Sequence, residues 1–233
     1  MAVGPHTRPV DTAPILTTVA AVRAFVEAKG PFTIAVWDFD GVIGDTEPAQ
    51  ASAYRDMLTE RGIELEDDFF DDLVGRSEPE IWTKVRDRYD VQGETAALRE
   101  ERITRVTPAL AEAVAPNWFV RPAVAALHES GTRSIVISSG NREVIDSYLD
   151  AWRLGSLFDE ISASSGSSED MPKRTRLREA IEDLPSALVV EDSADYLRLA
   201  SALGAVTIGV RHRLNGDAAE LADAIAPSGA EAT

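Results

Sequence analysis

Two aspartates lie two positions apart in the stretch VWDFDGVIGDT, residues 36–46, where an apolar run meets a glycine. On extended backbone the carboxylates of Asp38 and Asp40 lean toward one side. A buried pair of like charges is costly unless a cation or a shared proton relieves it. Because hard divalent cations prefer oxygen ligands, the pair predicts a metal site, above all for Mg²⁺. The alternative is an exposed acidic loop on an acidic protein.

A second acidic pair, Glu191 and Asp192, ends the apolar run SALVV. If the two runs form neighbouring parallel strands, all four carboxyl groups meet at one edge of the sheet, where such sheets bind ligands. Two acidic clusters at separate strand ends favour the metal site over the exposed loop.

The elements that would position these acids alternate along the chain. Short apolar runs predict strands over 32–37, 133–138, 158–163, 186–191 and 205–210, and helical patterns cover 142–155, 173–184, 193–204 and 216–226. This alternation predicts an α/β fold with a Rossmann-like parallel sheet covered on both sides. Residues 47–118 show helical patterns without a convincing strand, so an all-helical insertion is expected there.

The N-terminal region precedes the first strand. Residues 1–12 are expected to be a tail, and apolar residues at helical spacing predict a helix from Pro14, capped by Asp11 or Thr12, to Gly30. The helix could lie on a membrane or pack on its own domain; its polar face is not basic, which favours packing. The predicted domains are the tail and leader helix, 1–31, an α/β core, 32–46 with 119–226, and the insertion, 47–118.

Composition excludes several classes of function. The chain has 233 residues, with 23 basic and 40 acidic side chains and a net charge of −17, so it should repel nucleic acid and anionic membranes. It has no cysteine, and its three histidines show no metal-ligand spacing. The sequence shows neither a secretion signal nor an apolar run long enough to span a membrane. A cytoplasmic location is expected.

The stretch DFDGVIGDT resembles the first motif of the haloacid dehalogenase superfamily, D-x-D-G-x-x-x-D-[ST] after a hydrophobic strand. The resemblance continues in order through IVISSGN, Lys173 and VVEDSADYLRLASALGA, and covers residues 32 to about 212. The insertion after the first motif resembles the helical cap of the subgroup that contains β-phosphoglucomutase and small sugar-phosphate phosphatases. The resemblance implies an α/β core with an inserted all-helical cap domain.

This resemblance assigns roles to the acids. Asp38 would attack phosphorus and form an aspartyl-phosphate, and Asp40 would be the general acid and later the base. An acid at the second position favours phosphoryl chemistry over carbon–halogen chemistry. Asp38, the Asp40 carbonyl and Asp192 would hold Mg²⁺, with Glu191 as a further ligand or a partner behind the ligands. Thr46 would orient Asp40 near the substrate.

The resemblance also implies a phosphate-binding set. Ser138 would donate to the transferring phosphoryl group, and the amides of Ser139, Gly140 and Asn141 could form an anion nest, although serine-glycine turns are also commonplace. Lys173 would neutralise charge between nucleophile and phosphate. The chain has only three lysines, which favours this assignment. The family often has prolines after this lysine, whereas this chain has KRTR, so the register between Lys173 and Arg174 stays open.

Two arginines and two tryptophans outside the core motifs could take part in substrate binding or have only a structural role. Arg76, in the stretch LVGRSEPE that matches the substrate-facing loop of the cap, would contact a substrate oxygen or be a plain surface charge. Arg121 could likewise be an anion contact or a surface charge. Trp82 and Trp118, at helical positions, are expected in the core of the cap rather than as a platform for the substrate.

The sequence therefore predicts a Mg²⁺-dependent phosphatase that hydrolyses a small phosphomonoester, a sugar or polyol phosphate, through an aspartyl-phosphate. The first alternative is a sugar phosphomutase, which uses the same intermediate. A phosphonate hydrolase would need Lys84 for an imine. An inactive binding module is the last alternative, and the complete set of motif residues argues against it. The partner is a small phosphorylated metabolite; the oligomeric state is not predicted.

Overall fold

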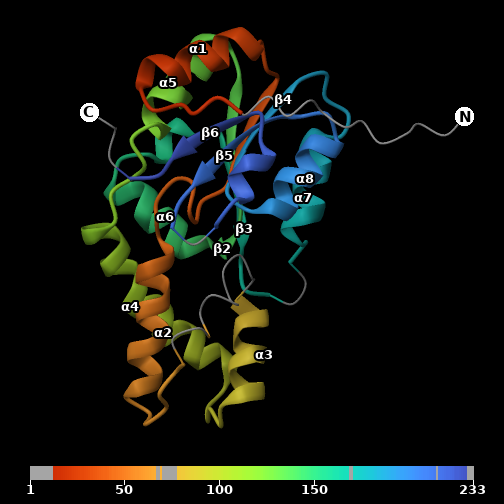
Figure 1. Ribbon diagram of the computed structural model, residues 1–233. Coiled ribbons are helices and arrows are strands. Elements are labelled where there is room, and N and C mark those ends of the chain that lie inside the picture. The colour runs from red at the N-terminus through yellow and green to blue at the C-terminus, as the bar shows by residue number, and fades with distance from the viewer. Residues whose placement is uncertain (1–12, 67–68, 70–77, 168–169, 214, 230–233) are drawn as a thin grey trace, which may run out of the picture.

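The computed structural model describes residues 13–66, 69, 78–167, 170–213 and 215–229. Its centre is a six-stranded parallel sheet with the order β3-β2-β1-β4-β5-β6 (Figure 1). The strands are β1 Ile34–Trp37, β2 Arg133–Asn141, β3 Glu160–Ser164, β4 Ala187–Glu191, β5 Val206–Arg211 and β6 Ala224–Pro227. The α/β class and the parallel sheet are confirmed.

Strand β1 lies in the middle of the sheet, between β2 and β4. Its last residue, Trp37, pairs with Val136 of β2 and Val190 of β4. All four residues of β1 are buried, as expected for a strand covered on both faces. Because parallel strands end at the same edge, this register brings the residues after β1, β2 and β4 together.

Helices cover both faces of the sheet (Figure 1). Alternate residues of β1 therefore belong to two different hydrophobic cores, one on each face. Ala35 and Trp37 pack with α1 Val19–Lys29, α5 Val120–Glu129 and α6 Arg142–Ala151. Ile34 and Val36 pack with α7 Lys173–Ile181 and α8 Ala194–Ala202. The two-residue period of the strand thus builds a three-layer core.

The segment between β1 and β2 contains helices α2 Glu47–Thr59, α3 Glu78–Arg88 and α4 Thr95–Ala113. They share a separate hydrophobic cluster: Tyr54, Met57, Leu58, Phe69, Trp82, Val85, Val91 and Leu98. Figure 1 shows them extending away from the sheet on the side opposite α1. The inserted helical cap is confirmed, and Trp82 is buried in it as expected. The placement of Trp118 in the cap core was wrong: it packs against the main core, and its Nε1 donates to the carbonyl of Pro227.

The predicted helix over 216–226 was wrong. The chain forms a short 3-10 helix, η3 Ala218–Leu221, and then β6, which pairs in parallel with β5. A second 3-10 helix, η2 Gly155–Leu157, precedes β3. The 3-10 helix η3 packs closely against β5 because residue 209 is glycine: a Cβ there would lie 2.6 Å from the carbonyl oxygen of Ala219. Strand pairing at the sheet edge overrides the helical propensity of an alanine-rich run.

The leader helix begins later than predicted. Thr18 caps α1 by accepting from the amide of Ala21, whereas residues 14–16 run beside β6. The amide of Ile225 donates to Pro14, and the amide of Leu16 donates to Ile225. Helix α1 buries its apolar face and lies beside α5, so packing on its own domain is confirmed. Among the described residues, every helix is too short or too polar to cross a bilayer.

Candidate active site

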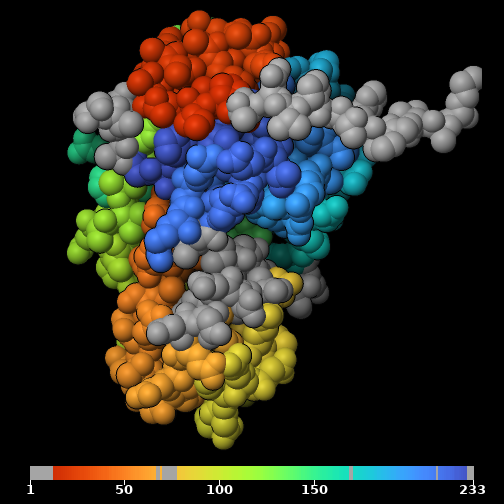
Figure 2. All heavy atoms as spheres, in the orientation of Figure 1, coloured from red at the N-terminus to blue at the C-terminus, as the bar shows by residue number. Residues whose placement is uncertain are grey.

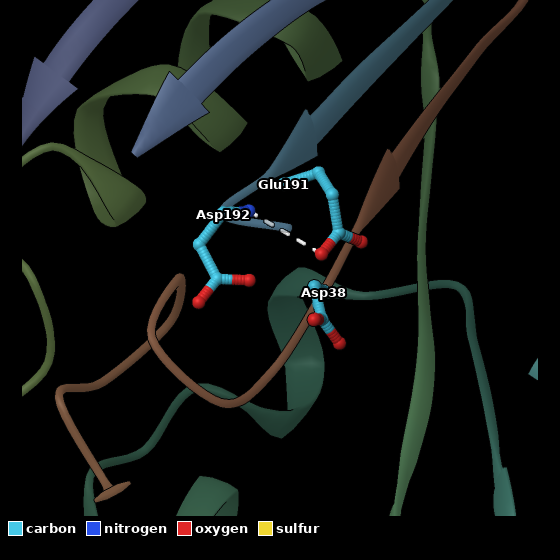
Figure 3. Close-up of side chains that lie close together, drawn as sticks. All are labelled: Asp38, Glu191 and Asp192. Atoms are coloured by element: carbon cyan, nitrogen blue, oxygen red, sulfur yellow. Dashed lines mark hydrogen bonds between the residues drawn. The ribbon is translucent and has the colours of Figure 1, made fainter. Parts of the chain in front are cut away.

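The acids predicted to hold a metal meet at the ends of the neighbouring strands β1 and β4 (Figure 3). Asp38 follows β1, Glu191 ends β4 and Asp192 follows it; all three are buried. One oxygen from each carboxyl group lies within 4.8 Å of the other two. The backbone shapes this cluster, because the amides of Asp192 and Ser193 both lie within hydrogen-bond distance of Glu191 Oε1.

Lys173 is the cation of this cluster. Its Nζ lies 2.6 Å from Asp38 Oδ2 and 2.8 Å from Glu191 Oε2, and 4.3 Å from the centre of the Tyr196 ring. Burial acts to lower the pKa of Lys173, but Asp38 and Glu191 outweigh it and raise the pKa, so the ammonium stays charged. Arg174 is exposed. Of the two candidates left open by the sequence, Lys173 and Arg174, it is therefore Lys173 that lies in the cluster.

The cluster carries more negative charge than Lys173 can balance. Burial, and next the charge of Glu191, raise the pKa of Asp38 to about 7, although Lys173 opposes the shift. Burial likewise raises the pKa of Glu191. A divalent cation among these oxygens would favour their charged forms and remove this cost. The residues present therefore fit a hard metal ion.

Asp40 has a different environment. Its Oδ1 accepts hydrogen bonds from the Thr46 hydroxyl and, at 3.3 Å, from Gln50 Nε2. Its Oδ2 faces the end of β2: a Cβ at Gly140 would lie 3.0 Å from Asp40 Oδ2 and 3.2 Å from Ser138 Oγ. Burial raises the pKa of Asp40, with Thr46 opposing. A carboxyl group with a raised pKa beside a hydroxyl-bearing strand end suits a general acid.

The end of β2 brings Ser138 and its neighbours to the same place. Ser138 is buried, and its Oγ accepts from the amide of Gly140 at 2.9 Å. Asn141 caps α6 by accepting from the amides of Glu143 and Val144. The proposed anion nest thus has one amide already engaged within its own turn. Ser139 is partly exposed beside it.

Arg176, one turn after Lys173 in α7, bridges the neighbouring strands β2 and β3 and was missed by the sequence analysis. Its guanidinium donates to the carbonyl of Ser138 at 2.7 Å and to the hydroxyl of Ser162 at 3.0 Å. This arginine stands within the KRTR stretch, where the chain departs from the family pattern. That departure was the only signal for it.

A hydrogen-bonded chain links Asp40 to the cap and was also missed. Arg102 of α4 is buried; it donates to Gln50 Oε1 at 2.7 Å and to Glu78 Oε1 at 2.7 Å. Arg99 donates to the other oxygen of Glu78, and to the carbonyl of Ser165 in the core. In the sequence these are two of twenty arginines, and nothing distinguishes them without the fold.

Glu47, the first residue of α2, is a further acid at the site. Burial, and next the charges of Asp40 and Asp192, raise its pKa to about 8. Its position directly after the first motif was the available signal. Of the other predicted contacts, Arg76 lies outside the described residues. Arg121 is exposed and donates to the carbonyls of Trp152 and Arg153 at the end of α6, as a surface residue does.

Comparisons with known proteins bear on the family and the fold. The sequence model of the haloacid dehalogenase-like hydrolases matches residues 35–210. CbbY from Rhodobacter sphaeroides, in complex with xylulose-(1,5)bisphosphate, is similar in structure with a TM-score of 0.70 and 19% identity, over 84% of this chain and 93% of that chain. A predicted phosphoglycolate phosphatase from Haemophilus somnus 129pt has a TM-score of 0.67 and 16% identity, over 84% and 93%.

A β-phosphoglucomutase from Clostridium difficile is also similar, with a TM-score of 0.64 and 16% identity, over 85% of this chain and 92% of that chain. No curated protein matches the sequence. At these identities the solved structures share the fold.

Proposed function

Because the chain belongs to the haloacid dehalogenase-like hydrolases, we propose that it is a Mg²⁺-dependent phosphatase that hydrolyses a small phosphomonoester through an aspartyl-phosphate. The substrate we propose is a sugar or polyol phosphate, a small metabolite met in the cytoplasm. The observation that carries the proposal is the contrast between two carboxyl groups two residues apart. Asp38 lies against a lysine ammonium, whereas Asp40 is held by a hydroxyl and an amide.

The contrast divides the work of phosphoryl transfer. A carboxylate oxygen of Asp38 attacks phosphorus while Asp40 donates its proton to the leaving oxygen, so the alcohol departs neutral. Lys173 and the Ser138 hydroxyl balance charge on the phosphoryl oxygens. Asp40, now a carboxylate, takes a proton from the water that attacks the aspartyl-phosphate. Inorganic phosphate leaves, and both aspartates return to their starting state.

The metal would be held by Asp38, Asp192 and the Asp40 carbonyl, with Glu191 either as a ligand or as the partner of Lys173. Its chemistry would be to neutralise negative charge on the phosphoryl group. An all-oxygen donor set without histidine or cysteine ligands favours Mg²⁺.

The test is phosphate release from a panel of phosphorylated sugars, polyols and small acids, with Mg²⁺ and with a chelator. Release that needs Mg²⁺ and disappears in Asp38→Asn supports the proposal. Equal release in metal-free buffer, or in Asp38→Asn, would contradict it.

A sugar phosphomutase is the second candidate, favoured by the structural likeness to a β-phosphoglucomutase. Both reactions form the same aspartyl-phosphate, and they differ in whether water or a second sugar hydroxyl accepts the phosphoryl group. Isomerisation of a sugar phosphate without net release of phosphate would identify the mutase. Cleavage of a phosphonate, with an imine at Lys84, and binding without turnover are the remaining alternatives, and the same panel with a phosphonate added separates them.

A further inference from the structure

His212 is buried against one of the acids proposed to hold the metal. It follows β5, and its Nε2 lies 2.7 Å from Asp192 Oδ2. The side chain of His212 is 0% exposed and that of Asp192 is 11% exposed. Because a carboxylate has no hydrogen to donate, the hydrogen of this contact belongs to His212 Nε2. The family motifs assign nothing to this histidine.

The loop that carries His212 is braced against β4. Asn215 Oδ1 accepts from the amide of His212 at 3.2 Å, and Asn215 Nδ2 donates to the carbonyls of Asp192 at 3.2 Å and Val210 at 2.6 Å. Asn215 therefore holds the backbone of both members of the contact. The histidine has a defined position from which to donate.

Gly41, which follows Asp40 and has a φ of +74°, lies beside the same pair. A Cβ at Gly41 would lie 2.4 Å from Asp192 Oδ2 and 3.0 Å from His212 Nε2. The first-motif loop therefore lies close to the contact between Asp192 and His212, and only a residue without a side chain fits at position 41.

We propose that His212 is a positioning residue that holds the carboxylate of Asp192 in the orientation that binds a divalent cation. The inference rests on the metal site of the proposed function. A hydrogen bond to one oxygen restricts the rotation of the carboxyl group and leaves the other oxygen for the metal. Donors behind metal ligands commonly work in this way, and their loss weakens metal affinity ~10–100-fold.

A purely structural role makes a different prediction. If His212 only fills space, a variant of similar size should bind metal normally once it folds. The test is Mg²⁺ binding to the protein without substrate, by isothermal titration calorimetry, with Mn²⁺ binding by electron paramagnetic resonance as a second readout. His212→Leu removes the donor, and His212→Gln keeps an amide donor near the place of Nε2.

We expect His212→Leu to weaken Mg²⁺ affinity ~10–100-fold. His212→Gln should recover most of that loss. The matched control is His128→Gln, which changes a surface histidine and should leave affinity unchanged. Thermal unfolding in a chelator must show that each variant folds. If His212→Leu does not fold, His212→Asn, whose amide falls one bond short of Asp192, replaces it in the comparison with His212→Gln.

Wild-type affinity in His212→Leu, or equal losses in the leucine and glutamine variants, would overturn the proposal, as would a wild-type protein that binds no Mg²⁺. Failure of the proposed function is distinguishable, because metal binding is measured without turnover. A protein whose Mg²⁺ affinity depends on His212 but that releases no phosphate would refute the phosphatase and leave this inference standing.

Discussion

Two buried cations, Lys173 at the strand ends and Arg102 in the cap, differ in the balance of charge around them: acids are in excess around Lys173, and arginines are in excess around Arg102. Lys173 contacts Asp38 and Glu191. Asp192 lies in the same cluster, so acids outnumber the cation. Arg102 instead shares the single carboxylate of Glu78 with a second arginine.

The difference indicates that the buried charges have different roles in the two regions, a structural role in the cap and a ligand-binding role at the strand ends. In the cap cluster each oxygen of Glu78 accepts a hydrogen bond from an arginine, so its charge is paired within the protein. The strand-end cluster is left with raised pKa values on Asp38, Asp40 and Glu191, a cost that a ligand can relieve. Perturbed acids gathered in one place are typical of a functional site.

The largest expected effect separates the two aspartates. Asp38→Asn should abolish turnover, because an amide does not attack phosphorus usefully. Asp40→Asn should slow hydrolysis of a sugar phosphate by ~10²–10⁴, and more where water activation also limits the rate. With a nitrophenyl ester the leaving group needs less protonation, so mass spectrometry of Asp40→Asn should show phosphate on Asp38. A phosphate adduct on Ser138 would contradict the mechanism.

Loss of the strand-end cation comes next. Lys173→Met leaves buried acids uncompensated, which should cost ~3–5 kcal/mol of unfolding free energy in a chelator. Part of this should return with Mg²⁺, because the metal supplies the missing positive charge. Urea unfolding with and without Mg²⁺ measures both effects. Lys29→Met, at the exposed end of α1, is the control and should change the free energy of unfolding little. Equal losses in both variants would contradict a specific role of Lys173 in balancing the buried acids.

The cap cation should matter less. Arg102→Leu leaves Glu78 with Arg99 alone and removes one donor from Gln50, so we expect a loss of ~1–3 kcal/mol in unfolding free energy. Mg²⁺ should not recover it, in contrast to Lys173→Met. Arg105→Leu, one turn along the same helix and on its exposed side, is the matched control. A Mg²⁺-dependent recovery of Arg102→Leu would break the distinction between the two regions.

The smallest effect concerns Glu47, where burial raises the pKa from 4.5 to about 8. A folded state that holds this proton more tightly is stabilised below the unfolded pKa, and the stabilisation is lost as pH rises through about 8. The glutamine side chain of Glu47→Gln does not ionise, so the variant does not lose this stabilisation. Its melting temperature minus that of wild type should therefore increase from pH 6 to pH 9.

We expect a relative gain of ~2–4 °C, the shift that accompanies about 1 kcal/mol in a chain of this size. Thermal unfolding in chelator across the pH range measures it. Parallel curves for the two proteins would show that Glu47 ionises normally.

Much of this protein follows from local sequence. The run before Asp38 is apolar over strand length, and the acids after it and at the end of SALVV occur at the carboxyl ends of strands, so parallel pairing alone brings them together. The contact from Thr46 to Asp40 was likewise expected, from the resemblance of the first motif to the family pattern. Patterns within a few residues of a strand end are readable because the backbone between them has few conformations.

Tertiary structure decided the rest. The run at 224–227 became a strand because β5 offered a free edge that its own composition does not reveal. His212 lies far along the chain from Asp192, and Arg102 lies far from Gln50 and Glu78. Each is one polar residue among many until folding buries it. Burial is what turns such a side chain into a partner, because a group removed from water must find its hydrogen bonds within the protein.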